Sequence, residues 1–253
     1  MPFTVSHAVV ALPFARALPG LAAAIAIGAM TPDLPLFLQG TPLGYAVTHS
    51  WAWIPLTALV AGALLLAWWM LVRPGIREFS PRWLAERLPE TWDERFRVAR
   101  PWVTAPALFL GLALGVATHL GWDAFTHAGQ PAAELLGLEK LWGPLPAYSW
   151  LQYGSSVIGL AVLLLAGILW VRRRPARPVR RVLPGAVRVV WWVSFPMALV
   201  TAWVVGLAVF GPFGDGFGPQ HLAFRMLLPT AALWVVPSIM LCAVIRIRRR
   251  KAV

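Results

Sequence analysis

The sequence predicts an all-α protein, a polytopic bundle of helices embedded in a membrane. The 253 residues are 59% hydrophobic and only 13% charged, whereas soluble domains carry about 25% charged residues. Several apolar runs approach or exceed the roughly 20 residues with which a helix crosses a bilayer. Since the sequence lacks the two-residue alternation typical of a membrane β-barrel, helices are the elements expected to satisfy the backbone in lipid.

Five apolar segments of 21 to 26 residues predict full membrane spans. They carry few or no charges before their ends and lie at 51–72, 102–127, 150–171, 188–210 and 226–246. An earlier apolar segment, 8–30, is broken by Pro13, Arg16 and Pro19. Its second half rises only about 17 Å, which is compatible with either a bent span or a re-entrant helical hairpin. We expect residues 1–253 to form one integral membrane domain.

Three segments hold 19 of the 22 Lys and Arg residues, namely 73–100, 172–188 and 246–253. All three fall on one side if the five segments are successive spans. Cytoplasmic loops carry the excess of Lys and Arg, so we predict a cytoplasmic connection, a cytoplasmic loop and a cytoplasmic basic C-terminal tail. The expected location is the plasma (inner) membrane, with 31–50, 128–149 and 211–225 on the outer face.

The net charge of +12 does not indicate nucleic-acid binding. The basic residues flank apolar spans and no nucleic-acid reading motif accompanies them, so the expected partner is the lipid bilayer. No basic residue precedes the first apolar stretch, so we expect the N-terminus to be retained rather than removed as a signal peptide. The single cysteine, Cys242, excludes an intrachain disulfide. No feature of the sequence sets an oligomeric state.

The strongest candidate site is the stretch Thr-His-Leu-Gly-Trp-Asp-Ala-Phe-Thr-His at 118–127. His119, Asp123 and His127 follow one another in steps of four, so a helix places them on nearly one face. An imidazole and a carboxylate one turn apart suit zinc and similar divalent ions. His127 lies about 12 Å along the axis from His119, so one ion binds both only if the helix bends; the alternative is a polar residue at a frayed helix end.

The depth of His119 and Asp123 in the membrane favours a functional interpretation of these two residues. Ionisable side chains within membrane spans are costly, usually face the bundle interior and mark function. We therefore interpret His119 and Asp123 as the centre of a site.

Three weaker motifs supply further candidates. His49 lies in Thr-His-Ser directly before a span, Asp33 lies between two prolines, and His7 ends the motif Thr-Val-Ser-His. Each has a structural alternative: Ser50 as a helix N-cap, Asp33 as a turn carboxylate, and Thr4 or Ser6 as a cap. The predicted topology nevertheless brings these imidazoles and carboxylates to one end of the bundle. His221 is expected to be an exposed loop residue.

These motifs, in this order, resemble the bacterial inner-membrane, metal-dependent hydrolase family. Within that superfamily the chain is similar to an uncharacterised branch whose members begin Pro-Phe-Thr-x-Ser-His, which is residues 2–7 here. The resemblance covers about residues 1–60 and 110–131. It departs at Pro35, where the hydrolases have a second Asp, and at 44–47, which lacks their His-Arg. These departures disfavour a two-metal site. The His-x-x-x-Asp spacing also resembles, more distantly, ligand pairs of zinc-dependent phospholipase C.

The resemblance implies a membrane-embedded, metal-dependent hydrolase acting on a lipid or phosphoester at the outer membrane face. The expected cofactor is a divalent metal, with zinc favoured. Asp33 and Asp123 are the candidate catalytic residues, since a carboxylate that does not bind the metal could act as general base. The full set of candidate metal ligands is His7, Asp33, His49, His119, Asp123 and His127. Two alternatives stay open: a non-catalytic transporter or interaction protein with a polar relay at these residues, and a purely structural polar cluster.

Overall fold

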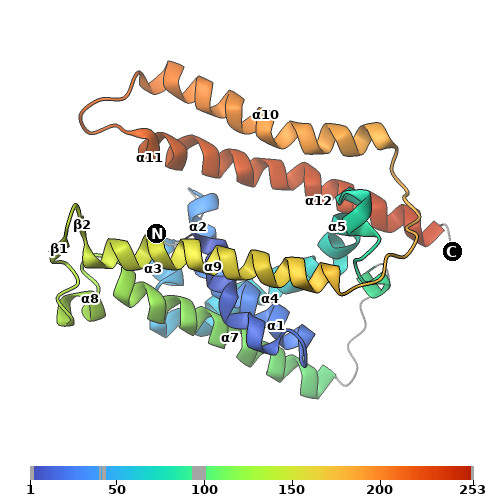
Figure 1. Cartoon of the computed structure of the whole chain (residues 1–253), viewed down its shortest axis with the longest axis horizontal. Helices are drawn as coiled ribbons and strands as arrows, with labels where there is room; N and C mark the ends of the chain where they lie inside the picture. The colour runs from blue at the N-terminus through green and yellow to red at the C-terminus, as the bar shows by residue number, and fades with distance from the viewer. Residues whose placement is uncertain (1–2, 40, 42–43, 93–100, 252–253) are drawn as a thin grey trace. The chain divides into compact units, whose positions relative to one another are not determined.

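The protein is helical almost throughout, which confirms the predicted class (Figure 1). The structure, a computed structural model, describes residues 3–39, 41, 44–92 and 101–251. Among these described residues, six helices are long and apolar enough to cross a membrane: Pro19–Phe37, Trp51–Phe79, Val103–Thr126, Ala147–Arg172, Gly185–Phe210 and Pro219–Arg249. The chain is therefore a multi-pass membrane protein.

The N-terminal hairpin differs from the sequence prediction in the length of its second arm. Helix α1 (Pro19–Met30) does not end the segment, because a 3₁₀ turn, η2 (Thr31–Asp33), and α2 (Leu34–Phe37) continue it. Pro32 and Pro35 do not break the segment because each lies at the start of a short helix, where no backbone N–H is required. The first arm, η1 (Thr4–Phe14), packs on α1 through Ala11 and Ile25.

The chain divides into two compact units, and the first contains every motif of the candidate site. Unit 1 comprises Met1–Pro35, Leu43–Leu66 and Arg97–Arg173. Besides η1, α1 and η2 it contains α3 (Tyr45–Thr48), η3 (Trp51–Trp53), α4 (Ile54–Ala67), α7 (Pro101–Thr126), α8 (Pro131–Leu135), β1 (Leu141–Trp142), β2 (Leu145–Pro146) and α9 (Ala147–Arg172). Strands β1 and β2 form a small antiparallel hairpin in which Leu141 pairs with Pro146 and Trp142 with Leu145.

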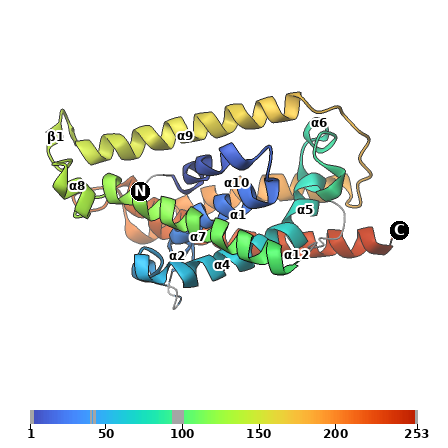
Figure 2. The ribbon, with the colours of Figure 1, turned by 90° about the horizontal axis from the view of Figure 1, so that it is seen from below.

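Helices α1 and α7 lie side by side in unit 1 and touch through glycine (Figures 1 and 2). A Cβ atom on Gly28 would lie 2.2 Å from the carbonyl oxygen of Leu112, and one on Gly115 would lie 2.2 Å from that of Ile25. Only glycine fits at such distances, and small residues of this kind let membrane helices approach closely. The close approach brings the last turn of α1 against the part of α7 that begins at His119.

Unit 2 comprises Leu36–Pro42, Ala67–Phe96 and Arg174–Val253. Its elements are the π-helical turn η4 (Trp68–Val72), α5 (Arg73–Phe79), α6 (Arg82–Ala85), η5 (Glu90–Trp92), α10 (Gly185–Phe210), α11 (Pro219–Leu222), η6 (Ala223–Leu227) and α12 (Leu228–Lys251). The fully buried Glu78 carboxylate accepts the backbone N–H groups of Val182 and Leu183 and pairs with Arg188 and Arg249. Part of the predicted connection at 73–100, residues 93–100, lies outside the described residues.

Candidate metal centre

The structure places five of the six candidate metal ligands together at one end of unit 1. His7 comes from η1, Asp33 from η2, His49 from the position after α3, and His119 and Asp123 from the last turns of α7. All are buried except His49, which is half-buried. The most enclosed are Asp33 and His119, each with 1% of its surface exposed. Residues far apart in the sequence thus share one polar interior site.

A backbone carbonyl fixes the tautomer of the neutral His119 ring. Its Nδ1 lies 2.8 Å from the carbonyl oxygen of Ala29. A carbonyl oxygen only accepts hydrogen bonds, so Nδ1 is the donor and the neutral ring has its lone pair on Nε2. Metal-bound histidines usually donate their second N–H in this way, which orients the ring. The close packing of α1 on α7 therefore fixes the orientation of the His119 ring.

The tautomer of the neutral His49 ring follows from the hydrogen bonds of its neighbour Thr48. The Thr48 hydroxyl donates to the carbonyl oxygen of Pro32 at 2.8 Å. The single hydrogen of the hydroxyl is then used, so the hydroxyl oxygen can only accept a hydrogen bond from His49 Nδ1, 3.2 Å away. The Tyr45 carbonyl oxygen is also 3.2 Å from His49 Nδ1 and can only accept. The proton of the neutral His49 ring is therefore on Nδ1. The Nε2 atom of the neutral His49 ring therefore also has a free lone pair.

Both carboxylates direct an oxygen toward these two nitrogens. Asp33 Oδ2 accepts the Thr4 hydroxyl at 2.7 Å. Its Oδ1, which has no hydrogen-bond partner among the described residues, lies 3.7 Å from Nε2 of His49 and of His119. Asp123 Oδ2 lies 3.6 Å from Nε2 of His49 and 3.3 Å from that of His119. The two Nε2 atoms are 3.3 Å apart.

Asp33, His49, His119 and Asp123 are hereafter called the four-ligand cluster. With neutral rings, all four facing atoms are hydrogen-bond acceptors, so they repel one another unless a proton or a metal ion lies among them. Bonds of about 2.0–2.2 Å to a tetrahedral zinc ion place neighbouring ligand atoms about 3.3–3.6 Å apart. Five of the six distances among the four facing atoms are 3.3–3.7 Å. Asp33, His49 and His119 form one group whose ligand atoms all lie within 4.8 Å of one another, whereas Asp123 belongs to another such group with His7 and His119. Two imidazoles and two carboxylates also suit zinc, iron or manganese, so this cluster can hold a divalent metal.

His7 lies beside the four-ligand cluster. Its ring stacks on that of His119 with centroids 4.1 Å apart. Its Nε2 lies 3.9 Å from Asp123 Oδ1, and neither atom has a hydrogen-bond partner among the described residues. His7, His119 and Asp123 thus form a second grouping that could hold an ion. Because His119 has one free nitrogen, the two groupings compete for it, and a single ion is the simplest occupancy.

The remaining histidines lie outside these two groupings. His127 Nδ1 lies 3.2 Å from the Asp123 carbonyl oxygen, and its Nε2 lies 3.4 Å from Gln152 Nε2. Burial lowers the pKa of His127, which follows the span Val103–Thr126, and keeps its ring neutral near pH 7. His221, in unit 2, is exposed and accepts the Gly218 N–H at 3.0 Å. His221 is exposed as the sequence analysis expected, but it lies in the short helix α11 rather than in a loop, and it belongs to neither grouping.

Thr4, Thr48 and the Ala29 carbonyl position the ligands, and the sequence analysis did not identify this role. It considered Thr4 and Ser6 as helix caps, but neither makes a capping hydrogen bond; the Ser6 hydroxyl donates to the Phe3 carbonyl oxygen. Ser50 precedes η3 without a side-chain capping bond. The available signal was that each threonine belongs to the same short motif as a ligand histidine.

Fold and site together define a multi-pass helical membrane protein with a buried histidine and aspartate cluster able to hold a metal. The chain belongs to the family described as a domain of unknown function (DUF4184), which matches residues 1–246. This confirms the expected uncharacterised family. No curated protein and no solved structure matches the chain.

Proposed function

We propose that the chain is a membrane-embedded, metal-dependent hydrolase that acts on a lipid or phosphoester. In this proposal Asp33, His49, His119 and Asp123 hold one divalent ion, with zinc favoured. The observation that supports it most directly is that five of the six distances among four acceptor atoms are 3.3–3.7 Å. The far sides of Asp33, His49 and His119 are each fixed by a hydrogen bond, an arrangement typical of metal ligands.

A bound divalent ion would lower the pKa of a water molecule toward neutrality and polarise the bond to be broken. Hydrolysis joins the water oxygen to the carbonyl carbon or phosphorus, breaks the bond to the leaving oxygen and gives that oxygen a proton. The two carboxylates have different roles here. Asp33 Oδ2 is occupied by the Thr4 hydroxyl, whereas Asp123 Oδ1 is buried without a hydrogen-bond partner among the described residues. Asp123 is therefore the better proton acceptor.

The proposal also includes the side of the membrane on which the cluster lies. The basic segments favour a cytoplasmic C-terminus in the plasma (inner) membrane. Helix α3 and the turn after α7 then face outward. Substrate would reach the cluster from the outer leaflet.

Metal content tests the proposal directly. Detergent-purified wild type, His119→Ala, Asp123→Asn and His221→Ala should be compared by elemental analysis after purification with zinc. We expect about one ion per chain in wild type and His221→Ala, and a large loss in the other two variants, since each lacks a ligand. Hydrolysis of a phospholipid or a chromogenic phosphodiester should fall with a chelator and return with zinc or manganese.

Wild-type protein without metal after purification in zinc would contradict the proposal. The remaining interpretations would then be a polar relay or a structural cluster. Those alternatives predict a transport or assembly defect in the same variants and no stoichiometric metal.

A further inference from the structure

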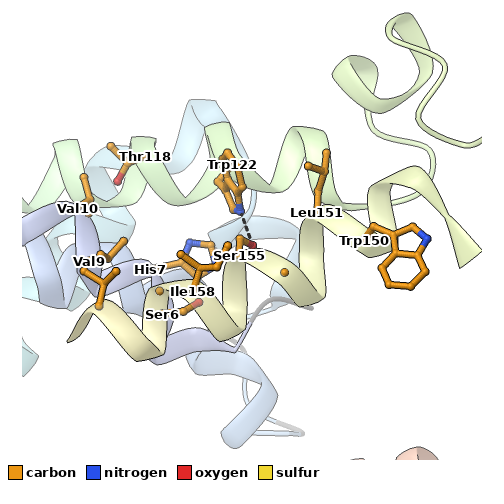
Figure 3. A pocket seen from close by; sticks show the side chains of 13 residues that line it. Ser6, His7, Val9, Val10, Thr118, Trp122, Trp150, Leu151, Ser155 and Ile158 are labelled. Carbon is orange, nitrogen blue, oxygen red and sulfur yellow. Dashed lines mark hydrogen bonds between the residues drawn. The ribbon is translucent and has the colours of Figure 1, made fainter. Parts of the chain in front are cut away.

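An apolar pocket of about 640 Å³ lies beside the four-ligand cluster, between η1, α7 and α9 of unit 1 (Figure 3). This volume is within the range of about 300–1,000 Å³ that is usual for small-molecule sites. Most of its lining side chains are aliphatic or aromatic. The aliphatic ones are Val9, Val10, Leu151, Ile158 and Val162.

The pocket reaches the four-ligand cluster through His7. This residue lines the pocket, and its ring stacks on that of His119. Its Nε2 is buried and has no hydrogen-bond partner among the described residues, and it lies 3.9 Å from Asp123 Oδ1. A ligand in the pocket therefore has a reactive polar group at one end and hydrocarbon side chains along the rest.

The hydroxyl groups in the wall are already engaged within the protein. Trp122 Nε1 donates to Ser155 Oγ at 3.1 Å, which Figure 3 shows beside His7. Ser155 Oγ donates to the Gln152 carbonyl oxygen, and Ser6 Oγ donates to that of Phe3. These groups do not need a polar ligand, so the wall beyond His7 is suited to a hydrocarbon chain.

Helix α9 connects the pocket to the surroundings of the bundle. It is a candidate membrane span with little of its surface buried. Val157 and Ile158, next to the pocket, expose 68% and 65% of their surface. In a membrane such side chains face acyl chains, so a hydrocarbon ligand can enter from the bilayer without crossing water.

We infer that this pocket holds the hydrocarbon chain of a lipid and presents the lipid's ester group at His7 to the four-ligand cluster. The substrate-class part of this inference rests on the proposed function, because it makes the hydrolase substrate a lipid. Chain binding itself depends only on the pocket. Occupancy by a chain can therefore be measured separately from metal binding.

Two glycines of α9 give a matched pair of variants. Gly154 lines the pocket and Gly167 does not. A Cβ atom added at either position meets nothing within 4 Å, so leucine is accommodated locally at both. Each replacement also removes a glycine from the helix interior, and this favours the helix in the same way at both positions. Gly154→Leu fills the pocket, whereas Gly167→Leu serves as the control.

The probe is palmitic acid with a diazirine near its methyl end, photolysed with the purified full chain in detergent. We expect saturable cross-links to Val9, Val10, Ile158 or Val162 that excess oleate removes. Labelling should fall about tenfold or more in Gly154→Leu, because the filled pocket cannot enclose the chain. It should remain in Gly167→Leu, and it should remain in Asp123→Asn, which alters the metal site only.

Labelling that oleate does not displace, or that is equal in Gly154→Leu and wild type, would overturn the inference. The oleate competition in wild type decides the matter even if Gly154→Leu does not fold. Metal content measured on the same samples separates the two proposals. Saturable labelling without metal would refute the metal centre alone, and metal without saturable labelling would refute the lipid pocket alone.

Discussion

At the scale of single residues, the cluster depends on hydrogen bonds that fix which ring nitrogen is free. His119 gives its Nδ1 proton to Ala29, and His49 has its Nδ1 proton directed at Tyr45 and Thr48. Both Nε2 lone pairs therefore face the same small volume before any ligand arrives. Such preorganisation lowers the cost of binding, since the rings need not reorient.

Replacing Thr48 tests this preorganisation without removing a ligand. Thr48→Val keeps the side-chain shape but loses the hydrogen bond to the Pro32 carbonyl and the constraint on His49 Nδ1. We expect metal affinity to fall about 10–100-fold, the usual effect of losing a group that orients a ligand. Competition with a metal-binding dye measures the affinity.

Thr57→Val is the matched control. Thr57 is equally buried, at 1% exposed, but its hydroxyl has no hydrogen-bond partner among the described residues. Metal affinity should be unchanged in this variant. Equal losses in both threonine variants would mean that Thr48 has no specific role at the cluster.

The residues that converge in the cluster could be selected from the sequence because ionisable residues in apolar spans are rare and costly. The residues that position them could not. Thr48 acts on a carbonyl 16 residues away, and the carbonyl bound by His119 is 90 residues away. Neither contact leaves a local pattern, since every residue, proline included, has a backbone carbonyl.

At the scale of elements, α7 presents its packing glycines and two residues of the four-ligand cluster on one face. Gly111, Gly115, His119 and Asp123 follow in steps of four, so they lie on nearly the same face. The glycines pack against α1, and the ligands continue beyond them. The position of His119 against the Ala29 carbonyl therefore depends on how closely the two helices approach.

Gly115→Ala should disturb both packing and metal binding. The added Cβ would lie 2.2 Å from the Ile25 carbonyl oxygen and 2.6 Å from the Ala29 nitrogen. Overpacking of this kind typically costs about 1–3 kcal/mol, and it separates His119 from its acceptor. We expect a lower unfolding midpoint and weaker metal binding, measured by thermal unfolding in detergent and by elemental analysis.

Gly121→Ala on the same helix provides the comparison. Its added Cβ would meet only the Trp51 ring, at 4.0 Å. This variant should be neutral or slightly stabilising, because alanine favours the helix over glycine. Equal destabilisation by both changes would show that the approach of α1 to α7 is not the cause.

The elements themselves differ in how well the sequence predicts them. The five long apolar runs coincide with five of the six candidate spans within a few residues, except that the helices starting at 51 and 219 extend farther. The continuation of the first apolar segment beyond Met30 to Phe37 was missed, because Pro32 and Pro35 also occur in turns. Proline is tolerated in the first turn of a helix, but the sequence alone does not show that new helical turns begin at Pro32 and Pro35.

At the scale of the whole molecule, sidedness determines which leaflet the cluster faces. The prediction rests on 19 of 22 basic residues lying in three segments. Labelling of single cysteines at exposed positions 90 and 140 tests it. Cys242→Ala supplies the background, because Cys242 is the native cysteine.

We expect an impermeant maleimide added to intact spheroplasts to label Lys140→Cys. Glu90→Cys should react only after permeabilisation, because basic segments remain in the cytoplasm. Labelling in the reverse order would place the turn after α7 inside and would refute an outer-leaflet substrate.

The origin of the four-ligand cluster in separate segments has a consequence for folding. An ion bound there would act as a reversible cross-link, joining side chains as far apart in the sequence as Asp33 and Asp123, which are 90 residues distant. A ligand present at about 1,000 times its dissociation constant adds about 4 kcal/mol of stability. Chelation should therefore lower the melting temperature of wild type and leave that of His119→Ala unchanged. Melting in the presence of different metals would then rank the ions before any substrate is known.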